Sequence, residues 1–206
     1  MVQENTKEGY ALKVRVKFAK EGAMKFIGHL DIMRYFQKAV KRANLDVAFS
    51  EGFSPHMIMS FASPLGVGIT STGEYFDMEL KSATTSSDMV KRLNDAMAEG
   101  MKILSIRQVE NGKASKAMSL VAAADYRLKF RETAKLPENW KEKLEEFKAQ
   151  KEIVILKKTK KSEKELDIRP FIYKLSLEEK DEIFMQLAAG SSNNTKPELV
   201  MEAFAA

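Results

Sequence analysis

Residues 10–22 alternate between apolar and basic side chains, and this alternation constrains the fold of the 206-residue chain more than any other feature. The even positions from 12 to 18 are apolar, and the odd positions between them are basic. A period of two places successive side chains on opposite faces of a β-strand. The segment is therefore predicted to be a strand with one face in a hydrophobic core.

Helical and extended patterns alternate through the rest of the first half. Residues 29–45 carry apolar side chains at helical spacing, with Asp31 near the positive N-terminal end of the predicted helix. Residues 86–100 read as a second helix, which opens with a serine cap and closes on Gly100. Further strands are predicted at 45–50, 57–62, 73–82 and 101–110. The resulting order is β-α-β-β-α-β, with an elaborated middle.

The same kinds of element begin again after a polar segment at 111–119. Helices are predicted at 137–150 and 196–206, each with a proline at its start. Extended segments are predicted at 124–130, 152–159, 164–177 and 181–190. No final strand follows the last helix, so either the second half is incomplete or its strand order differs.

These patterns favour an α+β fold built as tandem ferredoxin-like α/β sandwiches with antiparallel sheets. The domains are expected at residues 1–112 and 113–206.

Cysteine is absent, which excludes disulfides, thiolate zinc sites and iron–sulfur clusters held by this chain. We expect no cofactor and no metal site. There is no apolar run long enough to span a bilayer and no signal-peptide core, so we expect a cytoplasmic protein without a membrane partner. The net charge of +5 permits a polyanionic partner.

Two basic features are candidates for contacts with nucleic-acid phosphates. One is a helical stripe, in which residues 34, 38 and 41 follow one another at i, i+4 and i+7. The other is a lysine-rich segment at an expected hairpin tip. A solvated helix face and a soluble sheet edge are the alternative interpretations. The nucleic-acid-binding candidates are Arg34, Lys38, Lys41, Arg42, Lys157, Lys158, Lys160 and Lys161.

The segments FIGHLD, EGFSPH, SFASPLG with STGEYFD, and LDIRPFI resemble the bacterial radical-SAM-associated protein family. That family is a domain of unknown function, found fused to or encoded beside radical S-adenosylmethionine proteins. The resemblance implies a stand-alone module whose partner is a radical SAM protein. The substrate-binding candidates in these segments are His29, Asp31, Glu51, Ser54, His56, Glu74 and Arg169.

His29 and His56 are the only histidines, and histidine is the residue type that ordinarily titrates near neutral pH. A helix start explains Asp31 and a turn explains Glu51 equally well, but their joint occurrence points to one ligand-facing cleft shared by His29, Glu51 and His56.

We expect an accessory, non-catalytic module that binds RNA or an RNA-like substrate. An enzyme, such as a ribonuclease that uses His29 or His56 for acid–base chemistry, and a pure protein-docking subunit remain alternatives.

Overall fold

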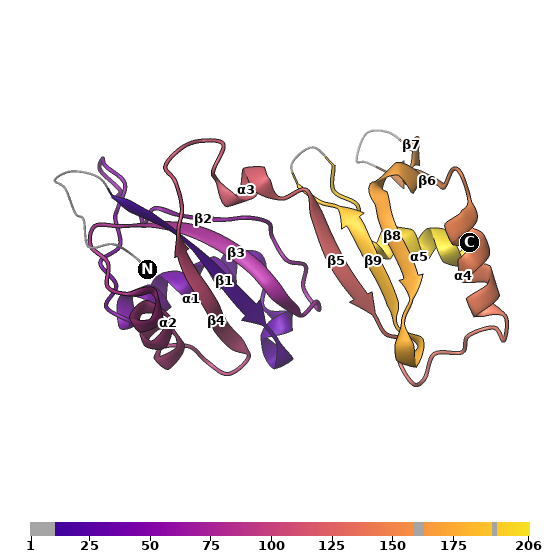
Figure 1. Cartoon of the computed structure of the whole chain (residues 1–206), viewed down its shortest axis with the longest axis horizontal. Helices are drawn as coiled ribbons and strands as arrows, with labels where there is room; N and C mark the ends of the chain where they lie inside the picture. The colour runs from indigo at the N-terminus through magenta and orange to yellow at the C-terminus, as the bar shows by residue number, and fades with distance from the viewer. Residues whose placement is uncertain (1–10, 159–162, 191–192) are drawn as a thin grey trace. The chain divides into compact units, whose positions relative to one another are not determined.

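The computed structural model describes residues 11–158, 163–190 and 193–206 (Figure 1). Helices combine with antiparallel sheets, which confirms the α+β class. The chain divides into two compact units, Met1–Leu120 and Val121–Ala206.

The first unit has the predicted β-α-β-β-α-β order. Its sheet has the strand order β2-β3-β1-β4, and every neighbouring pair is antiparallel. A five-residue 3₁₀ helix, Gly22–Phe26, follows the first strand. The strands are β1 (Leu12–Lys20), β2 (Met59–Phe61), β3 (Ser71–Leu80) and β4 (Met101–Gln108), and the helices are α1 (His29–Arg42), α2 (Ser86–Asp95) and α3 (Ala117–Leu120).

One face of this sheet packs against α1 and α2. The even residues of β1 lie on that face, as the period of two predicts, and they meet buried residues of α1 and α2 in one apolar cluster. Four phenylalanine rings stand at its centre, with centroids 4.7–6.0 Å apart. They are Phe18, Phe36, Phe61 and Phe76.

The other face of the sheet carries a buried ion pair that holds the segment after β4. Arg15 donates two hydrogen bonds to the carboxylate of Asp77, at 2.7 and 3.0 Å, and a third to the carbonyl of Ser115 at 2.6 Å. The Ala117 N–H also donates to Asp77, at 2.8 Å. Residues 115–117 are thereby fixed to the first unit.

Two local predictions for the first unit need correction. Residues 45–50 form isolated bridges, Val47 with Leu80 and Phe49 with Met57, instead of a continuous strand. The cap of α2 is Thr85, whose hydroxyl accepts a hydrogen bond from the Asp88 N–H at 3.2 Å. Threonine serves as well as serine here because either hydroxyl can satisfy a free N–H at the helix start.

The second unit distributes its strands over two sheets, where a tandem repeat of the first unit would have one. The larger sheet has the order β5-β9-β8, and β6 and β7 form a two-stranded sheet; all these pairs are antiparallel. The strands are β5 (Ala123–Leu128), β6 (Val154–Lys158), β7 (Glu163–Asp167), β8 (Ile172–Leu177) and β9 (Ile183–Ala188), and the helices are α4 (Trp140–Ala149) and α5 (Pro197–Ala205).

The single extended segment expected at 164–177 is interrupted. A short 3₁₀ helix, Arg169–Phe171, separates β7 from β8. Pro170 has no N–H to donate to a sheet, and the Asp167 carboxylate accepts hydrogen bonds from the Ile153 and Arg169 N–H groups at 2.8 and 2.9 Å. These bonds turn the chain, so β7 and β8 enter different sheets.

In the described part of the chain, no helix combines the length and the apolar character that crossing a membrane requires.

Candidate functional site

The last residue on the apolar face of β1 is Lys20, which lines a polar pocket. Lys20 continues the even-numbered series of core residues and is only 2% exposed. Its Nζ donates a hydrogen bond to the Ile27 carbonyl at 3.0 Å. Glu74 on β3 pairs with Phe18 and so lies on the same face of the sheet. His29 opens α1, and its ring meets Phe61 edge to face at 5.5 Å.

These three ionisable side chains line one small pocket, together with Ser63 and Leu65. The cavity measures about 10 Å³, which is room for about one water molecule. It can therefore hold a water or the tip of a side chain or ligand, but not a whole substrate. We call it the first-unit pocket.

Burial favours the neutral form of each group in the first-unit pocket. It lowers the pKa of Lys20, against the attraction of the Glu74 charge. It raises the pKa of Glu74, against a 2.8 Å hydrogen bond from the Ser71 hydroxyl and the charge of Lys20. Burial also lowers the pKa of His29, and the Lys20 charge lowers it further. A carboxyl group that holds its proton more tightly thus shares a pocket with an imidazole that holds its proton less tightly.

Glu51, Ser54 and His56 do not line the first-unit pocket. They are exposed in a loop that Ser50 closes: its N–H donates to the His56 carbonyl at 2.8 Å, and its hydroxyl contacts the His56 ring at 2.8 Å. The register explains the separation from His29. Phe61, which His29 contacts, lies five residues after His56 along a mostly extended segment, roughly 16 Å at about 3.3 Å per residue.

Asp31 does not line the first-unit pocket either. It is exposed in the first turn of α1 and pairs with Arg34 at 3.2 Å. An acidic residue in this position stabilises a helix start, which supports the structural interpretation of Asp31.

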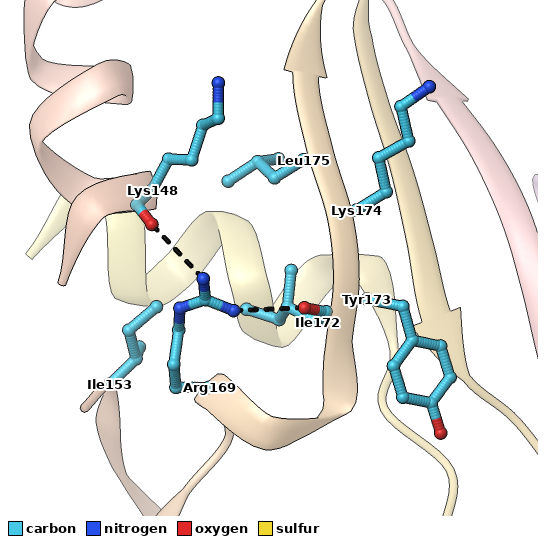
Figure 2. A pocket seen from close by; sticks show the side chains of 7 residues that line it. All are labelled: Lys148, Ile153, Arg169, Ile172, Tyr173, Lys174 and Leu175. Atoms are coloured by element: carbon cyan, nitrogen blue, oxygen red, sulfur yellow. Dashed lines mark hydrogen bonds between the residues drawn. The ribbon is translucent and has the colours of Figure 1, made fainter. Parts of the chain in front are cut away.

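Arg169 lies in a larger pocket in the second unit, of about 190 Å³ (Figure 2). Its guanidinium donates to the carbonyls of Gln150, Ile172 and Lys148, at 3.0, 3.1 and 3.4 Å. The acceptors include carbonyls at the end of α4, which a helix leaves without internal partners. The residues that line this second-unit pocket are Lys148, Ile153, Arg169, Ile172, Tyr173, Lys174 and Leu175.

The basic stripe of α1 faces outward as predicted. Arg34, Lys38, Lys41 and Arg42 are all exposed, while the opposite side of the helix is buried in the core. Arg42 also donates a hydrogen bond to the Ala96 carbonyl at 2.9 Å.

Lys157 and Lys158 end strand β6, which pairs with β7. The side chains of Lys157 and Lys158, and the whole of Lys160 and Lys161, fall outside the described residues.

Within residues 11–158, 163–190 and 193–206, no three histidine, aspartate or glutamate side chains gather in a way that would hold a metal ion.

The comparison with protein families identifies the kind of chain this is. Residues 13–197 match the model of a family described as an uncharacterised protein conserved in bacteria, DUF2344. This chain belongs to the DUF2344 family. The match spans both units and includes both pockets. No curated protein matches the chain.

Several pocket residues of this DUF2344 chain were not among the candidates. Lys20 had a usable signal, because the alternation that buries Val14, Val16 and Phe18 continues to position 20. Lys148, Tyr173 and Lys174 had none, because nothing in their local spacing separates them from other residues of a lysine-rich chain.

Proposed function

We propose that this DUF2344 chain is a non-catalytic accessory module that binds RNA in the cytoplasm and works with a radical SAM protein. The observation that carries the RNA part is the basic outer face of α1. Arg34, Lys38 and Lys41 are exposed along one side of a rigid helix, over about 10 Å of its axis. Cations on such a face bind a phosphate backbone and release its counterions.

Two features keep this face available to a ligand. The Arg34 pair with Asp31 is 71% and 67% exposed, and such surface pairs contribute only about 0–1 kcal/mol, so a phosphate can replace the carboxylate. The buried face of α1 anchors the helix in the core through Ile32, Phe36 and Val40, so binding requires no ordering of the backbone.

The radical SAM part of the proposal is supported by the resemblance of FIGHLD, EGFSPH and STGEYFD to radical-SAM-associated proteins. Because this chain has no cysteine, a thiolate-held cluster would belong to the partner. Co-purification from cells, with sequencing of bound RNA and mass spectrometry of bound protein, tests both parts together.

The RNA part is tested by replacing Arg34, Lys38 and Lys41 with Gln. Fluorescence anisotropy with single-stranded and hairpin RNA at several salt concentrations should show weaker binding by the triple variant across all sequences. The slope of log affinity against log salt should fall by about 2–3, at about 0.7–0.9 per lost phosphate contact. Gln is nearly as good a helix former as Lys or Arg, so circular dichroism should be unchanged.

The matched control replaces Lys91, which lies on the exposed side of α2 and pairs with Asp95, with Gln. This variant should bind RNA as the wild type does. A wild-type protein without saturable binding at low salt would overturn the RNA proposal.

The first-unit pocket supports a second candidate function, acid–base catalysis by Glu74 and His29. Their shared place in one pocket favours it, together with the opposite directions of their pKa shifts, because a carboxyl group that keeps its proton to higher pH suits a general acid and an imidazole that stays neutral to lower pH suits a general base. This differs from the expected use of His56, which lies outside the pocket. A ribonuclease assay distinguishes the two functions: RNA cleavage that His29→Gln abolishes without weakening RNA binding would favour catalysis.

A further inference from the structure

We propose that the second-unit pocket, around Arg169, binds the phosphate group of a phosphate monoester. This goes beyond the RNA-binding face of α1, because it concerns a different unit and stands whether or not α1 binds RNA.

Arg169 is held in place without being neutralised. Its three hydrogen bonds go to the carbonyls of Gln150, Ile172 and Lys148, which carry no net charge. Among the described residues, no carboxylate forms an ion pair with its guanidinium. A guanidinium has five N–H donors, so two remain after these three bonds. The fold thus supplies a fixed cation with free donors, and a tetrahedral oxyanion can accept from them.

Two lysines also line the pocket, and their ammonium groups extend away from Arg169 and add positive charge beside it (Figure 2). Figure 2 shows Lys148 from α4 and Lys174 from β8 extending in the same direction on either side of Leu175. The Lys148 pair with Glu145 is 44% and 58% exposed, so it is weak. Lys174 Nζ lies 4.9 Å from the centroid of the Phe184 ring, which orients the ammonium group without removing its charge.

The rest of the lining limits the size of the ligand group and strengthens its binding. Ile153, Ile172 and Leu175 are 4–6% exposed and form an apolar floor. Attraction between charges is stronger beside such a floor than in water. The volume of about 190 Å³ lies below the ~300–1,000 Å³ of pockets that enclose whole drug-sized ligands. A phosphate group fits this size, with the rest of the ligand outside.

Tyr173 places an aromatic ring next to the pocket. It lines the pocket and is 54% exposed. The ring extends away from Arg169 (Figure 2), where a nucleobase outside the pocket can stack on it. The phosphate monoester can therefore belong to a free nucleotide or to the phosphorylated end of an RNA, and the two sources share the chemistry that the pocket recognises.

The test measures ligand binding by the full chain with calorimetry. The probes are inorganic phosphate, adenosine 5′-monophosphate, and one short oligoribonucleotide prepared with a 5′-phosphate and with a 5′-hydroxyl. The pocket variant is Lys148→Gln with Lys174→Gln, which leaves the structural hydrogen bonds of Arg169 intact. The control is Lys143→Gln, on the same helix as Lys148 and exposed, but outside the pocket.

The wild type and the control should bind adenosine 5′-monophosphate equally, and the pocket variant should bind it about tenfold or more weakly. A free-nucleotide site would bind the monophosphate but not distinguish the two oligonucleotides, whereas an RNA-end site would prefer the 5′-phosphate form. Equal weakening by the pocket variant and the control, or no saturable binding of any phosphorylated probe, would overturn the proposal. Loss of oligonucleotide binding in the α1 triple variant alone would concern the proposed RNA function and not this pocket.

Discussion

Arg15 in the first unit and Arg169 in the second are both fixed by three hydrogen bonds, but their partners differ. Arg15 donates two of its bonds to the Asp77 carboxylate, which is 3% exposed. Arg169 donates all three to carbonyls. The first arrangement neutralises the guanidinium and joins parts of the fold, whereas the second leaves its charge available. The partners of the two arginines therefore distinguish them: Arg15 is paired with a carboxylate, and Arg169 is held by carbonyls alone.

The largest effect should come from removing the neutralising carboxylate. Asp77→Ala leaves Arg15 and Lys13 without their partner in a buried setting, since Lys13 Nζ also lies 3.6 Å from Asp77. Losing one member of a buried pair lowers the free energy of unfolding by about 3–5 kcal/mol. Urea denaturation followed by circular dichroism measures it. Asp95→Ala, which breaks an exposed pair with Lys91, is the control, and an equal loss in both variants would contradict the comparison.

A smaller loss is expected when Arg169 itself is removed. Arg169→Gln deprives the carbonyls of Gln150, Ile172 and Lys148 of their donor, which should lower the stability of the second unit by about 2–3 kcal/mol. Trp140 is the only tryptophan and lies in the second-unit core, so its fluorescence follows this unit during urea denaturation. Lys143→Gln should leave the midpoint unchanged. An Arg169→Gln midpoint equal to that of the wild type would show that the carbonyl bonds do not hold the second unit.

Two glycines near the first-unit pocket test how rigid the backbone is there. Gly100 has φ +85°, and a Cβ there would lie 2.6 Å from the Glu21 carbonyl oxygen, next to the strand that carries Lys20. Gly22 also has a positive φ, +54°, but a Cβ there meets nothing within 4 Å. Gly22→Ala should therefore destabilise by about 1–2 kcal/mol and Gly100→Ala by more, as thermal denaturation can measure. Equal losses of stability in the two variants would mean that the backbone around Gly100 and the Glu21 carbonyl can move apart to admit a Cβ.

The smallest effect should appear as a pH dependence of the first unit. Because the pKa of Glu74 is raised above its ordinary 4.5, the folded state binds its proton more tightly than the unfolded state. The stabilisation that the protonated Glu74 contributes to the folded state is present below pH 4.5. It is lost as the pH rises through the pKa of Glu74 in the folded state. Glu74→Gln should remove this loss, so the free energy of unfolding of the variant should rise relative to that of the wild type as the pH increases above 4.5. Urea denaturation at a series of pH values measures it.

His29 should act in the opposite direction. Its lowered pKa means that its contribution is present above the ordinary value of 6.5 and is lost as the pH falls through the folded-state pKa. For Glu74, the contradicting result is a gain in stability of Glu74→Gln over the wild type that shrinks as the pH rises. That result would contradict the raised pKa of Glu74.

The sequence predicted the elements in which apolar residues recur at a regular spacing. It failed where single side-chain contacts determine the path of the chain. The alternation in β1 and the helical spacing in α1 placed the first-unit core and the exposed stripe at Arg34, Lys38 and Lys41. The break between β7 and β8 depends on side-chain bonds of Asp167 to N–H groups, which no periodicity records.

The candidate sites followed the same rule. His29 and Glu74 lie together because β1, β3 and α1 share one core, while His56 is separated by the length of an extended segment. The second-unit pocket joins residues from α4 and β8, whose approach depends on the tertiary fold alone.

The most direct test of the difference between the two arginines follows their side-chain Nε–H signals by ¹⁵N nuclear magnetic resonance during a titration with inorganic phosphate. Each Nε–H is held by a hydrogen bond, Arg15 to Asp77 at 2.7 Å and Arg169 to Gln150 at 3.0 Å, so both signals should be visible. The Arg169 signal should shift and saturate while the Arg15 signal stays in place. Equal shifts of both signals, or a shift of Arg15 alone, would contradict the claim that only the carbonyl-held arginine keeps its charge for a ligand.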